Sequence, residues 1–196
     1  NAIQALVDGD GHLADEIRAN DKKVDRMEVE IDEEATLIIA RRQPTARDLR
    51  LVISVIKMVA DLERVGDHCT SIAKEVKKLN QSPPVKPYID LPKMADAAVA
   101  MLQDAITAYF NKDIEAALEI IKRDDVIDRL DDKITQELLV YINAESTNTR
   151  NIISLMFITR SIERIADYAT NIAEMIYFMV TGDIIKHCSP DKVVDG

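Results

Sequence analysis

The chain has 196 residues, a length that fits one large domain or two small ones. It contains 5 glycines, 6 prolines and 31% charged residues but only 4% aromatic residues, a composition that favours an all-helical protein. The net charge of −10 argues against nucleic-acid binding, which normally needs a basic stripe. The sequence shows no disulfide framework, membrane span or signal peptide, so we expect a cytoplasmic location.

The first half of the chain reads as one short helix followed by two long ones. A helical remnant over 1–7 ends at the sequence "DGDG", and a long helix is predicted over 12–42. Its apolar residues recur at intervals of three and four, which is typical of a helix that packs in a bundle. The sequence "QPT" ends this helix, and Pro44 with Thr45 begins the next, which we expect to extend to Leu79.

The second half repeats this scheme after a linker. Four of the six prolines fall within 80–92, and helices rarely tolerate such a run. The periodicity then predicts helices over 91–111, 114–143 and 149–180, and Gly182 is a natural C-terminal cap for the last one.

The halves align with each other. Residues 5–31 match 108–134 without gaps at an offset of 103, and "LERVGDHCTSIAKEV" at Leu62 matches "IERIADYATNIAEMI" at Ile162 at an offset of 100. We therefore predict an all-α fold of two tandem three-helix bundles with an internal pseudo-repeat and an up-down antiparallel topology. The two predicted units cover residues 1–82 and 83–196.

The repeat also predicts that the first helix is truncated. Asn1 aligns with Asp104, whereas the second half has helix before that point, from about Leu91. We expect the given sequence to start inside its first helix, without an equivalent of the segment from Tyr88 to Gln103.

Acidic pairs four residues apart recur on two helices of each half. They comprise eight carboxylates: Asp21, Asp25, Glu63, Asp67, Asp124, Asp128, Glu163 and Asp167. At 100° per residue, Glu63 and Asp67 lie roughly 130–170° from the core seam of their helix, so we expect this pair and its copy on an outer face. If the two helices of a half are level, four carboxylates converge on one surface.

Converging carboxylates are hard oxygen ligands, which suit Mg²⁺, Ca²⁺, Mn²⁺ or oxidised iron better than structural zinc. His68 has Tyr168 as its counterpart, so it is not a repeated ligand. The helices lack the Glu-x-x-His motif of oxygen-activating di-iron bundles. Two alternatives stay open: a metalloenzyme that uses the same carboxylates, and a helical module without metal whose acidic face is simply solvated.

Four arginines surround the turn between the two long helices of the first half: Arg41, Arg42, Arg47 and Arg50. We expect them to form ion pairs with Glu33, Glu34 and Asp48 rather than to bind an anion, although a partner surface stays open. The sequence offers no glycine-rich phosphate loop and no nucleophile signature, so no catalytic residue is predicted.

The combined pattern resembles the PhoU family. The resemblance lies in "DKKVDRME", "QPTARDLRLVISVIKMVADLERVGDHCTSIAKE", "DDVIDRLDDKI" and "ITRSIERIADYATNIAEMIYFMVTGDIIKH", which together span most of the chain. The second half departs from the first in having "AESTNTRN" where the first has "QPTARDLR", and in having Ala166 where the first has Gly66.

This resemblance implies two three-helix bundles and multinuclear iron or zinc clusters, held by the eight carboxylates named above. It implies an adaptor, not an enzyme, that represses phosphate uptake and the phosphate-starvation response. The implied partners are the ATPase subunit of the phosphate ABC transporter, a membrane sensor histidine kinase and a second copy of the chain. An accessory role for another phosphate carrier is the alternative.

Overall fold

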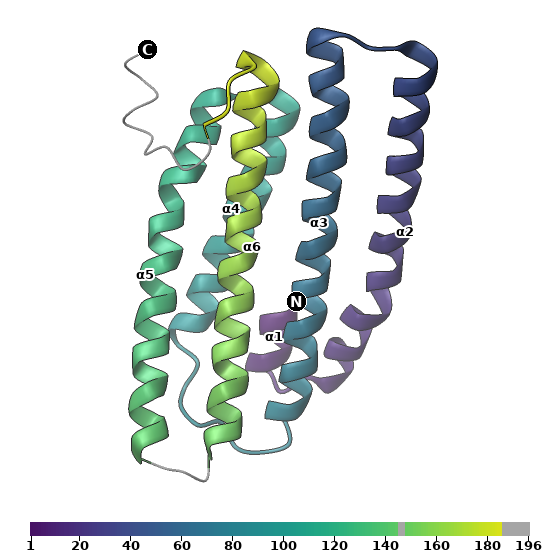
Figure 1. Ribbon diagram of the computed structural model, residues 1–196. Helices are drawn as coiled ribbons and strands as arrows, with labels where there is room; N and C mark the ends of the chain where they lie inside the picture. Colours follow the sequence, from purple (N-terminus) through teal and green to yellow (C-terminus); the bar gives the residue numbers. More distant parts are fainter. Residues whose placement is uncertain (145–147, 186–196) are drawn as a thin grey trace.

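The computed structural model describes residues 1–144 and 148–185. Within these ranges the chain forms helices and no strand, which confirms the all-α prediction (Figure 1). The helices are α1 (Ala2–Val7), α2 (Gly11–Arg42), α3 (Ala46–Leu79), α4 (Asp90–Asn111), α5 (Ile114–Ala144) and α6 (Thr149–Thr181).

The helix ends lie within one or two residues of the sequence predictions. Thr45 is the N-cap of α3 rather than part of its first turn, because its backbone is extended, with φ of −125°. At the other end of the fold, Gly182 closes α6 in the left-handed region with φ of 89° and donates its amide to the Phe178 carbonyl, as expected of a glycine cap. His187 and Cys188 lie outside the described residues.

Helix α6 lies at the centre of the molecule, where it packs against α3, α4 and α5 (Figure 1). Helix α3 is its pseudo-repeat equivalent in the first half, and the packing of α3 on α6 joins the two halves. The apolar residues of both halves form one continuous cluster. The proposed units 1–82 and 83–196 meet in the connection between α3 and α4, and this division stays a prediction.

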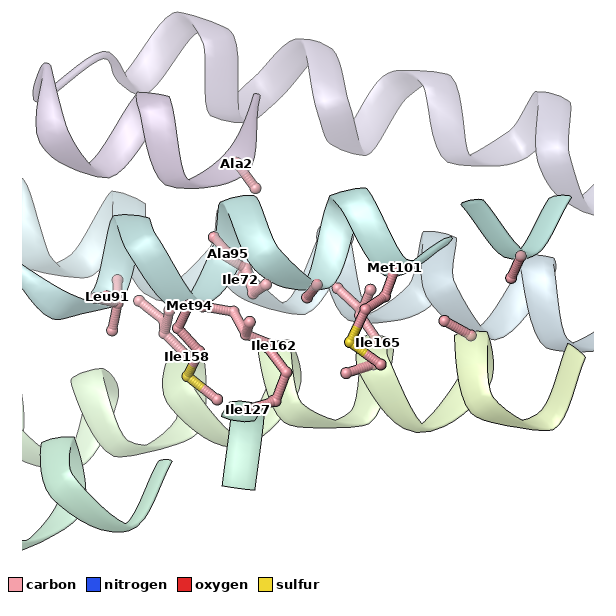
Figure 2. Packing of buried hydrophobic residues seen from close by; sticks show 14 of the residues in the cluster. Ala2, Ile72, Leu91, Met94, Ala95, Met101, Ile127, Ile158, Ile162 and Ile165 are labelled. Carbon is pink, nitrogen blue, oxygen red and sulfur yellow. The ribbon is translucent and has the colours of Figure 1, made fainter. Parts of the chain in front are cut away.

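The core consists mainly of isoleucine, methionine and alanine side chains. Figure 2 shows Met94 of α4, Ile127 of α5 and Ile158 and Ile162 of α6 gathered in one region of it. Ile127 and Ile158 are fully buried, and Ile162 retains 2% of its exposure. Because protein interiors are close-packed, this seam fixes how α5 turns its polar face along α6.

The first half is less covered than the second. Helix α1 has 6 residues, whereas its counterpart α4 has 22. Consequently Leu62 and Val65 of α3 are only partly buried, while the equivalent residues of α6, Ile162 and Ile165, are buried. Among the described helices, none combines the length and the hydropathy that crossing a bilayer would require.

Candidate functional site

In the second half, the predicted carboxylates of α5 and α6 face one another. Asp124 and Asp128 lie one turn apart on α5, and both are influenced electrostatically by Asp167 of α6. Burial is the main cause that raises the pKa of each of the two α5 carboxyls, followed for Asp124 by repulsion from Asp128. The pKa of Asp124 is raised to about 6, even though Thr170 donates a hydrogen bond to its carboxylate.

Glu163 is buried, with 9% of its surface exposed, so the outer-face prediction is wrong for this residue. The prediction treated α6 as a helix with one covered face, whereas α6 is covered by three neighbours. Arg160 Nη1 donates to Glu163 Oε1 over 2.6 Å, but Oε2 is buried and has no hydrogen-bond partner. Burial and then Asp167 raise the pKa of Glu163.

The first half brings its carboxylates together in the same way but less deeply. Glu63 is half-buried, and its pKa is raised by burial, then by Asp67, and then by Glu28 and Asp25 of α2. Asp21 lies over Gly66, since a methyl group added at Gly66 would lie 3.3 Å from Asp21 Oδ1. Acidic side chains of α2 thus act on Glu63 of α3 or lie close to its helix, and the ligand set stays a prediction.

Each half also carries a third acidic position that the sequence analysis missed. Glu28 acts on Glu63, and Asp131 acts on Glu163. The two residues are repeat equivalents at the offset of 103 and lie three residues after Asp25 and Asp128. The signal was available, because positions i, i+4 and i+7 share a helix face.

Comparison with known proteins identifies the family of this chain. The sequence matches the family described as "PhoU domain" over residues 1–76 and 91–176. A phosphate-specific transport system accessory protein PhoU homolog of Pseudomonas putida is 37% identical over 190 residues, covering 95% of this chain and 73% of the relative. The Escherichia coli K12 protein named phosphate-specific transport system accessory protein PhoU is 36% identical over 195 residues, covering 98% and 80%.

The chain belongs to the PhoU family.

Solved PhoU structures share its fold. The crystal structure of PhoU from Pseudomonas aeruginosa superposes with a TM-score of 0.90 at 36% identity, covering 93% of this chain and 88% of that one. The phosphate transport system regulatory protein PhoU from Streptococcus pneumoniae gives a TM-score of 0.86 at 28% identity, covering 94% and 87%. The predicted family and its helical fold are therefore confirmed.

The carboxylates of this PhoU chain do not form a closed metal cage. Within 1–144 and 148–185, no three His, Cys, Asp or Glu side chains lie close enough together to hold a metal ion. Two of the predicted ligands are instead turned toward arginines, since Arg160 binds Glu163 and Arg164 Nη1 donates to Asp167 Oδ2 over 2.9 Å.

The chemistry of the acidic residues nevertheless fits a hard cation. Several carboxyls of one half raise one another's pKa, and the buried oxygen Glu163 Oε2 accepts no hydrogen bond, its ion-pair partner Arg164 Nε lying 3.8 Å away. A divalent cation would reduce the repulsion between the carboxylates and would give the Oε2 atom of Glu163 a bonding partner. The ligand assignment itself stays a prediction.

The predicted arginine pairs are wrong for the part of the chain that the structure describes. There, none of the four arginines around the α2–α3 turn forms an ion pair with any acidic residue, including Glu33, Glu34 and Asp48. All but Arg50 are exposed, and the Nε of Arg50 is buried without an acceptor. This turn is therefore a free basic region on an acidic protein.

Proposed function

We propose that this chain is an accessory protein of phosphate transport that represses phosphate uptake and the phosphate-starvation response when phosphate is plentiful. The observation that carries the proposal is the match to relatives named phosphate-specific transport system accessory proteins over 95% or more of the chain. A purely regulatory role also fits names that describe accessory and regulatory proteins rather than enzymes.

The proposed mechanism is docking through bundle surfaces in the cytoplasm. The chain, as a homodimer, would link the ATPase subunit of a phosphate ABC transporter to a sensor histidine kinase. Long, rigid helices provide extended faces for such contacts: α3 and α6 have 34 and 33 residues, which corresponds to roughly 50 Å each.

In this proposal, metal ions organise the two acidic faces. The eight predicted ligands would hold multinuclear iron or zinc, with Mg²⁺, Mn²⁺ or Ca²⁺ as alternatives. When bound, such ions would neutralise the repulsion between helices and supply a positively charged patch on an acidic surface. Glu163 would turn its Oε2, which accepts no hydrogen bond, from the Arg164 Nε 3.8 Å away toward the metal, and Asp124 would bind in its ionised form.

The regulatory role can be tested in a bacterium that lacks its own PhoU protein and carries a phosphate-starvation reporter. Expression of this protein should restore repression in phosphate-rich medium, and the ATPase subunit should be recovered with it from cell extracts. A well-expressed, folded protein that leaves the reporter fully active would contradict the proposal.

Metal binding needs a separate measurement, on protein purified without chelator. The double variant Glu63→Ala/Glu163→Ala should retain less than half of the wild-type metal content, measured by mass spectrometry. The matched control Glu30→Ala/Glu119→Ala removes two exposed carboxylates that lie outside the predicted ligand set and should retain all of it. Equal metal content in both variants would overturn the ligand assignment. Substrate turnover by the metal-loaded protein would favour the metalloenzyme alternative.

A further inference from the structure

The basic residues of the α2–α3 turn belong to one end of the molecule. The α2–α3 turn, the α4–α5 turn and the end of α6 lie together there, at the top of Figure 1. A cavity of about 210 Å³ lies between them. Its walls are Arg47, Asp48 and Leu51 of α3, Lys112 of the α4–α5 turn, and Met179 and Val180 of α6.

The charges of this cavity favour an anion. Arg47 and Lys112 reach it from different elements, and neither forms an ion pair within the described ranges. Asp48 also lines it, so the lining carries two positive charges against one negative charge. In a chain with a net charge of −10, an unpaired basic cavity is a local exception.

Arg50 is a further cation on α3, although it does not line the cavity. It follows Arg47 by three residues, so the two side chains share a face of α3. The Arg50 guanidinium packs against the α6 cap, where Nη1 would lie 3.4 Å from a methyl group placed on Gly182. Its Nε is buried and has no hydrogen-bond partner. Arg50 therefore adds to the positive charge at this end of the molecule.

Arg47 lies at the end of α3 where the helix dipole does not favour a cation. The positive end of the α3 dipole coincides with Arg47, the second residue of the helix, whereas cations are normally favourable at the opposite end. By contrast, Arg41 and Arg42 lie in the last turn of α2, where the dipole accounts for them. The placement of Arg47 thus has no stabilising partner in the fold itself.

The internal repeat provides a comparison within the molecule. The position aligned with Arg47 carries Thr147, and the position aligned with Lys112 carries Gly9. The basic cavity therefore does not follow from the repeated sequence, because the positions aligned with its two cations are uncharged.

We propose that this cavity binds a phosphate-class oxyanion between Arg47 and Lys112. The shared ligand chemistry is a phosphate group, either free inorganic phosphate or the headgroup phosphate of an anionic lipid. The proposal does not rest on the proposed function, since it concerns binding by the isolated protein.

The test titrates inorganic phosphate into the full protein in a phosphate-free chloride buffer, after removal of metal by a chelator, using calorimetry. Saturable binding is expected with a Kd on the order of 1 mM or tighter. The double variant Arg47→Gln/Lys112→Gln should bind at least tenfold more weakly. The control Lys74→Gln/Arg150→Gln makes the same change in net charge at exposed residues away from the cavity, and it should change the affinity less than twofold.

A second arm measures co-sedimentation with phosphatidylglycerol vesicles, using phosphatidylcholine vesicles as the reference. If these anionic vesicles bind through Arg47 and Lys112 while free phosphate does not, the site takes its phosphate from a lipid headgroup. Circular dichroism verifies that all variants are folded. The proposal is overturned if neither probe binds the wild-type protein, or if both double variants lose binding equally.

Discussion

The two halves of the molecule place the same acidic pattern in different environments. In the second half, α4 covers the bundle along 22 residues, Glu163 is buried and the pKa of Asp124 is raised to about 6. In the first half, α1 provides only 6 residues, and Glu63 is half-buried. The motif therefore defines which carboxylates act on one another, whereas the covering helix sets how deeply they are buried.

The largest difference between the halves is expected in the stability lost when an apolar core residue of α6 or α3 is truncated. Ile162→Ala should destabilise the metal-free protein by about 3–4 kcal/mol, because the side chain is buried at 2% exposure and leaves a cavity. The repeat-equivalent change Leu62→Ala should cost only about 1–2 kcal/mol, because Leu62 is partly exposed already. Urea unfolding measures the loss of stability in both variants. Equal losses would contradict the difference in burial between Ile162 and Leu62.

A second pair of variants examines two equivalent serines, each of which bonds a different helix. Ser54 shares a buried 2.7 Å hydrogen bond with the Tyr109 hydroxyl, while Ser154 donates to Glu75 over 2.7 Å. Ser54→Ala should cost about 2 kcal/mol, because it leaves a buried phenol hydroxyl unsatisfied. Ser154→Ala should cost at most about 1 kcal/mol, since Glu75 keeps its ion pair with Lys78. Thermal unfolding that ranks them in reverse would contradict this reading of the two contacts.

A third pair concerns the carboxylates themselves. The folded-state pKa of Asp124 is raised from 3.8 to about 6, so its ionised form opposes folding, and this penalty grows as pH rises through 6. After allowance for its partial exposure, Asp124→Asn should stabilise the metal-free protein by about 1 kcal/mol at pH 7, and by less near pH 4. The equivalent change Asp21→Asn should have less than half this effect, because α1 leaves that half more open to solvent.

Unfolding curves at pH 4, 5, 6 and 7 in the presence of chelator test whether the stability gained by Asp124→Asn increases with pH. A gain from Asp124→Asn that stays constant across this range would exclude ionisation as its cause. Added metal should reverse the sign if Asp124 is a ligand, since the amide binds a cation less strongly than the carboxylate.

The sequence pattern was sufficient for most of the fold because periodicity and caps are local. The 3–4 spacing of apolar residues and caps such as Gly182 placed each described helix end within two residues of its observed position. Burial of Glu163 could not be predicted in this way. It depends on how many helices surround α6. The apolar pattern of one helix does not reveal the number of its neighbours.

The candidate site was partly predictable for the same reason. The repeat located the acidic pairs, and a longer view of it would have added Glu28 and Asp131. The arginine pairs were mispredicted because proximity in sequence does not place charges in contact across a turn. Arg50 instead packs its guanidinium against Gly182, about 130 residues further along the chain.

The smallest change in stability is expected at Gly66, the glycine within the acidic motif of the first half. Gly66→Ala introduces the residue that the second half has as Ala166. Alanine favours a helix interior by about 1 kcal/mol over glycine, but the added methyl group would lie 3.3 Å from Asp21 Oδ1, a tight contact. Because that oxygen belongs to a side chain that can rotate, the helix gain should prevail and leave a net stabilisation of about 0.5 kcal/mol.

The measurement is chemical unfolding of metal-free protein, with Gly11→Ala as a control, because that substitution has open space around the added methyl group. A loss of stability at Gly66 alone would mean that Asp21 cannot move aside. Asp21 would then be fixed in its place despite the thinner cover that α1 provides.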